Sequence, residues 1–412
     1  MRTFFTLQAI VTISLLFSCT STEQEKSLQE KAAKIHAEAL TIDSHTDTPL
    51  RLMRPGSNLF ERNDPREGGG KIDFPRMKEG GLDGVFFAVF VGQGPRTPEG
   101  HEDAKQQALA TFDSIYALLR KHPEVIQPGY KASDLKEMNE QGKLAIYFGM
   151  ENGYPIGTDL SLLQKFYDLG TRYITLCHGE NNDICDSSTD EEGPEHGGLS
   201  EFGERVIREM NRLGIMIDVS HISDEAFYDV LITSEVPVIA SHSSVRALCD
   251  HPRNLDDEML LSLADNGGVI QVCAVSDFIK EGEPYPERDS AKMAVVEKHG
   301  NYYELPPEAK EAFLVDWFAV DTIFPPHLAT VSEFVDHIDH IASIAGIDHI
   351  GIGTDFDGGG GLKDCFDVSE LGNITLELVR RGYNKEDINK IWGGNLLRVF
   401  KEVEEYSQNQ AL

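Results

Sequence analysis

Short apolar runs alternate with helix-like segments along most of the chain, and this alternation restricts the possible folds more than any other feature. Several runs are continuously hydrophobic, as expected for parallel strands buried on both faces. The eight predicted strands are Leu40–Asp43, Val85–Val91, Ala145–Met150, Tyr173–Leu176, Met216–Val219, Val238–Ala240, Gly268–Val275 and His349–Gly353. Helical patterns between them include His101–Lys121, Glu201–Leu213, Asp224–Ile232 and Val331–Ala345. Eight such alternations predict one (β/α)8 barrel rather than two doubly wound domains.

Two connections are longer than the usual loop of an α/β protein. The stretch Asp183–Gly198 is acidic and Gly-rich, and Ser276–Ala329 contains several Pro, Tyr and acidic residues together with one or two expected short helices. Both connections leave the carboxyl ends of predicted strands. In barrel enzymes such insertions usually cover the active site.

Several predicted strands end in a side chain that can bind a metal ion. The ends are Asp43-Ser44-His45-Thr46-Asp47, Met150-Glu151, Leu176-Cys177-His178, Asp218-Val219-Ser220-His221, Ala240-Ser241-His242 and Gly353-Thr354-Asp355. Each motif alone is weak, because a single His at a strand end is more often a hydrogen-bonded structural residue. Together they bring four His and three carboxylates to the rim where barrel enzymes place catalysis. Imidazole and carboxylate ligands without thiolate suit zinc, with manganese or cobalt as alternatives.

The number of candidate ligands points to two ions rather than one. His45, Asp47, Glu151, His221 and His242 make five, which suffices for two ions if one carboxylate is shared. Glu151 is the natural bridge, since a carboxylate can give one oxygen to each ion. A water between two such ions loses a proton near neutral pH and becomes a nucleophile. Besides these three histidines and His178, the chain has ten more. They fall in helices, in loops or at the amino-terminal end of a strand, and we interpret them as surface or structural residues.

These residues resemble the membrane dipeptidase (renal dipeptidase) family of zinc dipeptidases, within the amidohydrolase superfamily. The resemblance extends from about Leu40 to Phe400. It is most specific at Asp43-Ser44-His45-Thr46-Asp47, from Met150 through Tyr173 to Asn181, from Gly198-Leu199-Ser200 to His221, and at Ser241-His242-Ser243-Ser244, Gly353-Thr354-Asp355-Phe356-Asp357-Gly358 and Gly394-Asn395-Leu396-Leu397-Arg398. It implies two zinc ions per chain, with His45 and Asp47 on one ion, His221 and His242 on the other, and Glu151 on both.

The resemblance also implies substrate contacts. His178 would stabilise the oxyanion at the scissile carbonyl, and Arg253 would hold the C-terminal carboxylate of a dipeptide. Asp355 would carry the proton and contact the free amino group, with Asp357 as the next candidate for the proton shuttle. The implied activity is hydrolysis of dipeptides, with a D-residue at the C-terminal position left open.

The sequence departs from the family pattern in three places. Cys177 stands where Thr is expected before the histidine, and Asn152 stands where Gly is frequent. The insertion 276–329 is longer than in the animal enzymes, which puts the shape of the pocket in doubt. Many members of the wider superfamily bridge their ions with a carboxylated Lys, but none of the strand ends above carries a suitable Lys.

Two alternative functions remain. A different amidohydrolase, acting on an N-acyl amino acid or a cyclic amide, would keep the metal ions and change the pocket. A non-catalytic lipoprotein that binds metal or peptide would need no proton shuttle, so the presence of Asp355 and His178 counts against it.

The amino terminus is typical of an exported lipoprotein. Arg2 precedes an apolar run from Phe4 to Phe17, which is short for a membrane span and suits a signal peptide. Residues 1–18 are therefore predicted to be the signal peptide, and Leu16-Phe17-Ser18-Cys19 resembles a bacterial lipobox with Cys19 as the lipidated residue. Residues 19–30 would form a polar tether, and residues 31–412 a single hydrolase domain. The expected location is the periplasmic or cell-surface side of a membrane, and an ordinary secretory signal is the alternative.

Charge and cysteine content limit the partners. The formal net charge of −32 repels phosphate backbones, so we expect no nucleic-acid partner. We expect contact with a membrane only through the lipid on Cys19, and a homodimer is left open. The other five cysteines, Cys177, Cys185, Cys249, Cys273 and Cys365, form no C-x-x-C motif. They indicate neither a disulfide framework nor a thiolate zinc site.

Overall fold

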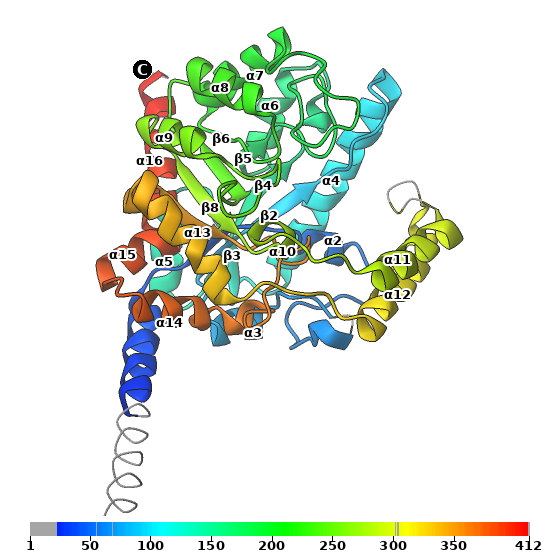
Figure 1. Ribbon diagram of the computed structural model, residues 1–412. Coiled ribbons are helices and arrows are strands. Elements are labelled where there is room, and N and C mark those ends of the chain that lie inside the picture. Colours follow the sequence, from blue (N-terminus) through cyan, green and yellow to red (C-terminus); the bar gives the residue numbers. More distant parts are fainter. Residues whose placement is uncertain (1–22, 55, 68, 301, 303–304, 411–412) are drawn as a thin grey trace, which may run out of the picture.

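Eight parallel strands form a barrel in the computed structural model (Figure 1). The structure describes residues 23–410 except 55, 68, 301, 303 and 304. Their order around the barrel is β1-β2-β4-β5-β6-β7-β8-β9, with β3 paired to β4 outside this path. The strands are β1 Ile42–Thr46, β2 Gly84–Phe90, β3 Ile126–Pro128, β4 Leu144–Glu151, β5 Thr171–Thr175, β6 Met216–Asp218, β7 Ile239–Ser243, β8 Val269–Cys273 and β9 Ile350–Gly353. The N–H of Asp355 bonds the carbonyl of His45 at 3.0 Å, and the N–H of Asp47 bonds that of Phe356 at 2.9 Å. These bonds join the end of β9 to β1, which confirms the predicted (β/α)8 barrel.

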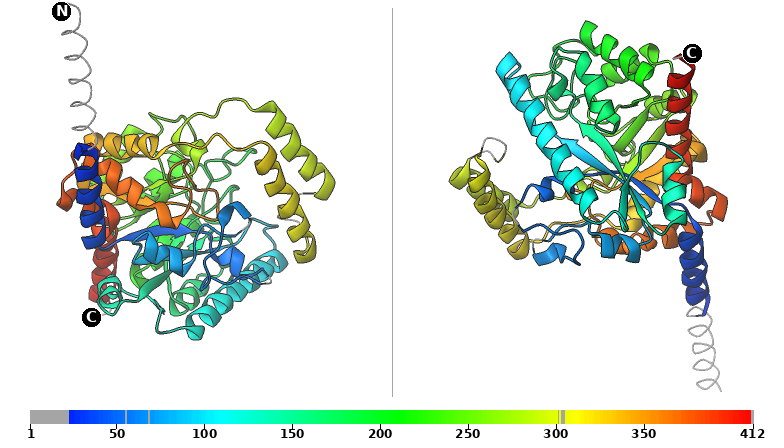
Figure 2. Two further views of the ribbon diagram at one scale, coloured as in Figure 1. Left: turned by 90° about the horizontal axis from the view of Figure 1, so that it is seen from below. Right: turned by 180° about the vertical axis from the view of Figure 1, so that it is seen from behind.

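Helices follow most of the strands and cover the outside of the barrel (Figures 1 and 2). They are α2 Pro49–Leu52, α3 Phe74–Glu79, α4 Pro98–Lys121, α5 Asp134–Glu140, α6 Ser161–Asp168, α7 Glu201–Leu213, α8 Asp224–Thr233, α9 Asp257–Asp265, α10 Ser276–Ile279, α11 Pro286–His299, α12 Pro307–Ile323, α13 Val331–Ile344, α14 Gly372–Arg380, α15 Lys385–Asn389 and α16 Asn395–Gln410. The helix predicted over Glu201–Leu213 has those bounds, because strong caps define both ends. The Ser200 hydroxyl accepts the N–H of Gly203, and Gly214 ends the helix in the left-handed conformation.

The last helix, α16, closes the amino-terminal end of the barrel. Its residues Leu396, Val399, Phe400 and Val403 belong to one buried cluster with side chains near the start of the strands, such as Phe86. The Phe400 ring lies 5.9 Å from that of Tyr147 and 6.4 Å from that of Phe86, centre to centre. Because the amino-terminal end is filled with apolar side chains, only the carboxyl end of the barrel can hold a polar site.

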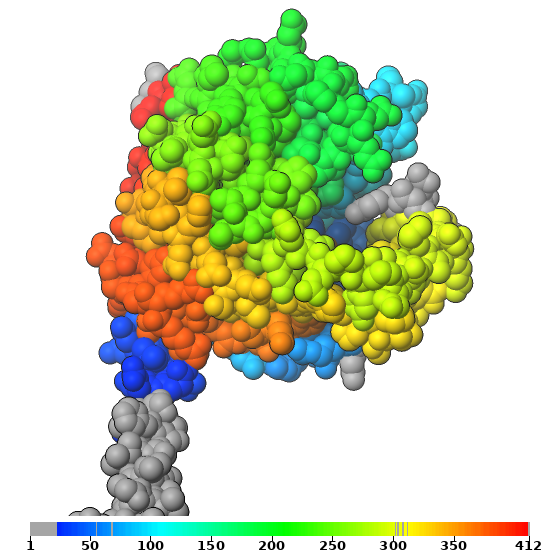
Figure 3. Space-filling model, in the orientation of Figure 1, coloured from blue at the N-terminus to red at the C-terminus, as the bar shows by residue number. Residues whose placement is uncertain are grey.

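The insertion after β8 contains more helix than we expected. In place of one or two short helices, the short α10 is followed by α11 and α12, of 14 and 17 residues. The two longer helices pack against each other through a small core of their own that includes Val295, Phe313 and Val320. This hairpin stands away from the barrel, and the surface is hollowed between the two (Figures 1 and 3). The other long connection, 183–198, has no helix.

The predicted signal peptide and Cys19 lie outside the described residues. Residues 23–38 are helical, so the described part of the predicted tether is a helix rather than extended chain. Among the described residues, no helix is both long and apolar enough to cross a membrane. The five cysteines from Cys177 onward are all buried and free.

Candidate metal centre

The seven strand-end residues that the sequence singled out all meet at the carboxyl end of the barrel. They form three overlapping groups, His45–Glu151–His242, Glu151–His178–His221 and His45–Asp47–Asp355, and within each group the possible ligand atoms lie within 4.8 Å of one another. His45 and His242 belong to strands β1 and β7, and Glu151 ends β4. The other four follow strand ends. Because parallel strands end at the same edge, one barrel rim collects them all.

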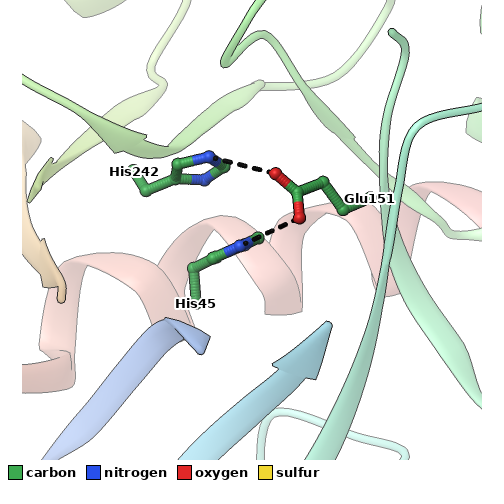
Figure 4. A group of neighbouring side chains, drawn as sticks. All are labelled: His45, Glu151 and His242. Carbon is green, nitrogen blue, oxygen red and sulfur yellow. Dashed lines mark ion pairs between the residues drawn. The ribbon is translucent and has the colours of Figure 1, made fainter. Parts of the chain in front are cut away.

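Glu151 lies at the centre of this group (Figure 4). Its Oε1 atom is 3.2 Å from Nε2 of His221 and 3.5 Å from Nε2 of His242. Its Oε2 atom is 3.4 Å from Nε2 of His45. Each carboxylate oxygen therefore faces a different set of histidines, which is the arrangement that a bridging ligand requires.

Several polar atoms of the cluster are buried without a hydrogen-bond partner. They include Nε2 of His45, Oε2 of Glu151 and Oδ1 of Asp47. A buried polar atom without a partner is costly, and in a native protein it calls for an ion, water or ligand. Imidazole nitrogens and carboxylate oxygens at these positions fit a pair of divalent ions of the zinc type. The residues present thus fit the metal ions that the sequence suggested.

The histidines of the cluster have strongly perturbed pKa values. Burial lowers the pKa of His242 to about 3, with a further lowering from the charge of His45. Burial and the nearby Arg253 hold the pKa of His221 well below its usual value. Both rings are therefore neutral at pH 7 and keep a lone pair for a metal ion. Burial also lowers the pKa of His45, but the carboxylates of Glu151, Asp47 and Asp355 together raise it more, to about 10, so a metal ion at His45 would take the place of a proton.

The three carboxylates of the cluster differ in pKa: that of Glu151 is lowered, whereas those of Asp47 and Asp355 are raised. Burial raises the pKa of Glu151, yet His45 and the other histidines bring it well below its usual value. Burial and the Glu151 charge hold the pKa of Asp47 well above normal. Burial also raises the pKa of Asp355 to about 7. Three carboxylates packed together resist full ionisation until cations join them, which favours binding of divalent ions.

The backbone is strained at the same place. His221 has φ of 75° and Asp355 has φ of 56°, and side chains other than glycine rarely adopt this left-handed conformation. Such conformations persist where the surrounding structure imposes them, and they are concentrated at functional sites. Gly358 supports the same arrangement, because a Cβ there would lie 2.1 Å from Oδ2 of Asp47 and 2.2 Å from Oδ1 of Asp355. Only glycine lets the loop approach both carboxylates.

Arg253 lies beside the cluster in a loop after β7. Its guanidinium donates to the carbonyl of His242 at 3.0 Å and stacks over the ring of Phe278 at 5.3 Å. The side chain is buried, its Nε has no hydrogen-bond partner, and among the described residues no carboxylate lies within ion-pair distance of it. A buried cation without a counter-ion is unfavourable alone, so this guanidinium is suited to an anionic ligand.

Comparison with known proteins identifies the family. The profile of the membrane dipeptidase family, peptidase family M19, matches residues 29–412. The chain belongs to the membrane dipeptidase family. Dipeptidase tcpJ of Claviceps purpurea is 32% identical over 346 residues, which are 83% of this chain and 71% of that protein.

Two solved structures are similar over almost their whole length. The probable dipeptidase PvdM from Pseudomonas aeruginosa has 31% identity and a TM-score of 0.79, and the match covers 92% of this chain and 99% of that one. A metallopeptidase from Rhodobacter sphaeroides, crystallised with a phosphinate mimic of the dipeptide L-Ala-D-Ala, has 25% identity and a TM-score of 0.70. That match covers 88% of this chain and 99% of the other.

Two of the three departures from the membrane dipeptidase pattern, Asn152 and Cys177, lie close to this site in the structure. Asn152 has φ of 75°, a conformation that costs glycine nothing and that Asn tolerates better than most residues. Its amide also donates to the carbonyl of Val91 at 3.0 Å and accepts the N–H of Tyr154 at 3.1 Å. Cys177 is fully buried, with its thiol 3.7 Å from the carbonyl of Asp186. Neither side chain belongs to the group of candidate ligands.

One residue of this dipeptidase site was not singled out in the sequence. The hydroxyl of Tyr173 lies 2.8 Å from Nδ1 of His45, on the side of the ring opposite Glu151. Gly149 makes room for it, since a Cβ there would lie 2.0 Å from the Tyr173 ring. The signal was present as a Tyr inside a predicted strand and a Gly inside its neighbour. Asp357, the alternative proton shuttle, instead accepts hydrogen bonds from the Thr48 hydroxyl and the Lys71 N–H.

Proposed function

We propose that this protein is a dinuclear zinc dipeptidase. His45 and Asp47 would hold one ion, His221 and His242 the other, and Glu151 both. The observation that carries the proposal is the buried guanidinium of Arg253, which has no carboxylate within ion-pair distance among the described residues and lies next to a cluster of histidines and carboxylates. A metal site alone fits many hydrolases, whereas an anion site beside it selects a small substrate with a free carboxylate.

The substrate we propose is a dipeptide, including one with a D-residue at its C-terminal position. Arg253 binds the carboxylate at one end and Asp355 contacts the amino group at the other, so the distance between these side chains limits substrate length. The ligand of the Rhodobacter sphaeroides relative, a mimic of L-Ala-D-Ala, supports the acceptance of D-residues. An N-acyl amino acid would lack the amino group that Asp355 contacts.

The residues of the site divide the work of hydrolysis. A bound pair of zinc ions supplies Lewis-acid polarisation and activation of water at neutral pH. Arg253 fixes the substrate, and His178, whose side chain is 29% exposed, faces incoming substrate and donates a hydrogen bond to the oxygen of the scissile carbonyl. Asp355 takes a proton from the attacking water and delivers it to the leaving nitrogen, because the other histidines are committed as ligands.

A direct test combines metal analysis with a substrate panel. The purified protein should contain about two zinc ions per chain and hydrolyse L,L- and L,D-dipeptides. Tripeptides, tetrapeptides and N-acetyl amino acids of the same composition should be poor substrates. Efficient cleavage of tetrapeptides would refute the two-ended substrate site, and preference for N-acyl amino acids would indicate another amidohydrolase.

We also propose that the protein is an exported lipoprotein. The apolar run from Phe4 to Phe17 and the lipobox-like Leu16-Phe17-Ser18-Cys19 support this location. A lipid on Cys19 would hold the hydrolase domain at the periplasmic or cell-surface side of a membrane.

A further inference from the structure

A fully buried carboxylate, Asp218, lies directly beneath the two histidines assigned to one ion. It is the last residue of β6 and, among the described residues, no basic side chain pairs with it. Its Oδ1 atom accepts the N–H groups of Ser220 at 3.0 Å and Ser241 at 2.8 Å. Its Oδ2 atom accepts the hydroxyl of Ser241 at 2.6 Å and that of Thr175. All of its hydrogen bonds therefore come from residues that flank His221 and His242 or from the adjacent strand.

The hydroxyl of Ser241 connects this carboxylate to a ligand ring. It lies 2.7 Å from Nδ1 of His242 as well as 2.6 Å from Asp218. The Asp218 carboxylate accepts the backbone N–H groups of Ser220 and Ser241, and a hydroxyl has only one proton, so the Ser241 proton points to Asp218. The Ser241 oxygen must then accept a hydrogen bond from the Nδ1–H group of His242. This places the ring hydrogen on Nδ1 and leaves a lone pair on Nε2, which lies 2.9 Å from Nε2 of His221 and 3.5 Å from Oε1 of Glu151.

We propose that Asp218 and Ser241 are positioning residues that set the tautomer of His242 and so prepare its Nε2 atom for a metal ion. The inference rests on the proposed metal site and assigns a role to two residues outside it. His221 is held differently, because its Nδ1 atom has no hydrogen-bond partner and its backbone is in the left-handed conformation. The ring of His242 is thus oriented by a hydrogen-bond chain from Asp218, whereas the ring of His221 makes its polar contacts through Nε2, 2.9 Å from Nε2 of His242 and 3.2 Å from Oε1 of Glu151.

Replacing the Asp218 carboxylate by an amide should reverse the direction of the hydrogen bonds from Asp218 through Ser241 to His242. In Asp218→Asn, an amide Nδ2 in place of Oδ2 would donate to the Ser241 oxygen. The Ser241 proton would then turn to Nδ1 of His242, and the ring hydrogen would move to Nε2. A protonated Nε2 cannot bind a metal ion. The isosteric change Asp218→Asn would therefore block His242 as a ligand, although Asp218 itself does not contact His242.

The test compares Ser241→Ala and Asp218→Asn with Ser44→Ala. Ser44 is an equally buried serine of the barrel, but its hydroxyl donates to the backbone carbonyls of Ser241 and Ile352 and to no ligand side chain. Zinc affinity is measured on the metal-free full chain by competition with a chelator. Outer partners of metal ligands are typically worth about 10–100-fold in affinity. We expect losses in that range for Ser241→Ala and Asp218→Asn, and less than about threefold for Ser44→Ala.

A second measurement reads the tautomer without metal or activity. In the metal-free protein with ¹⁵N-labelled histidine, the ring shifts of His242 should show hydrogen on Nδ1 in the wild type and on Nε2 in Asp218→Asn. Equal zinc affinities for Ser241→Ala and Ser44→Ala, or an unchanged tautomer in Asp218→Asn, would overturn the inference while leaving the dipeptidase proposal intact. A wild-type chain that binds no zinc would instead refute the proposed function, and the tautomer measurement would still decide the role of Asp218.

Discussion

Replacing Glu151 by Gln tests the bridging carboxylate with almost no change in shape. The expected loss of zinc affinity can be judged from the pKa of His45, because this pKa reflects how strongly the site attracts a positive charge. The pKa of His45 is raised from 6.5 to about 10 despite burial, with Glu151 as the largest attractive charge. One pKa unit corresponds to about 1.36 kcal/mol, so the site favours a single positive charge beside His45 by roughly 5 kcal/mol.

A zinc ion carries twice the charge of that proton, and in the proposed site it would be held by Glu151. If Gln at position 151 removes half of the stabilisation, about 2–3 kcal/mol, binding weakens by one to two orders of magnitude, since every 1.4 kcal/mol is tenfold. We expect both ions to be affected, because the two oxygens of Glu151 face different histidines. Bound zinc should fall from about two per chain to one or fewer, and dipeptide hydrolysis should collapse.

The assay is zinc content after dialysis against a fixed free-zinc buffer, followed by turnover of a dipeptide. Glu404→Gln is the matched control, because Glu404 is partly buried and bonded to the N–H of Ala132, away from the described cluster. It should keep two ions and normal activity. A Glu151→Gln protein that retains two ions with wild-type affinity would show that Glu151 is not the bridge.

Four further predictions concern the substrate, the proton, the pH and the anchor. Arg253→Lys keeps the charge but loses the bidentate fork, so KM for dipeptides should rise at least tenfold; an unchanged KM would remove Arg253 from the carboxylate site. Asp355→Asn should lower kcat by about 10²–10⁴-fold with zinc content unchanged, and an effect of only a few-fold would place the shuttle elsewhere. His45 must release its proton to bind metal, so zinc affinity should rise by up to about tenfold per pH unit between roughly pH 7 and 9. Calorimetry in two buffers should detect that proton, and a pH-independent affinity would contradict the assignment. Cys19→Ala should abolish lipid attachment and move the protein from the membrane to the soluble fraction, whereas a wild-type protein already soluble with an unmodified amino terminus would indicate an ordinary secretory signal.

The barrel could be predicted because its strands are continuous apolar runs, and all eight predicted runs are strands. The missed strand β3, Ile126–Pro128, has three residues and ends in proline, which is too short for any periodic pattern. Strand β1 was expected at Leu40–Asp43 and lies at Ile42–Thr46. Its second half contains Ser44, His45 and Thr46, which are extended because the site buries them and not because of their own preference.

The ligand set could be predicted for a related reason, since every candidate ligand lies within four residues after the end of a predicted strand. Arg253 lies in an irregular loop, where a sequence pattern does not distinguish a buried guanidinium from a surface one, and only the family resemblance pointed to it. The positioning residues are harder still. Asp218 and Ser241 stand close to ligands in the sequence, but the hydrogen bonds that join them connect two different strands. The sequence of one strand alone does not show which residues of a neighbouring strand it will contact.

The position of α16 has a consequence for the order in which this protein can be made. The rings of Phe86 and Tyr147 pack against Phe400 near the end of the chain, and the strand pair that closes the barrel joins His45 to Asp355. Contacts so distant in sequence form late and slowly. A chain emerging from the ribosome therefore cannot complete its core until almost the last residue has been added. Until then the amino-terminal end of the barrel remains open, and the rings of Phe86 and Tyr147 lack the cover that Phe400 provides.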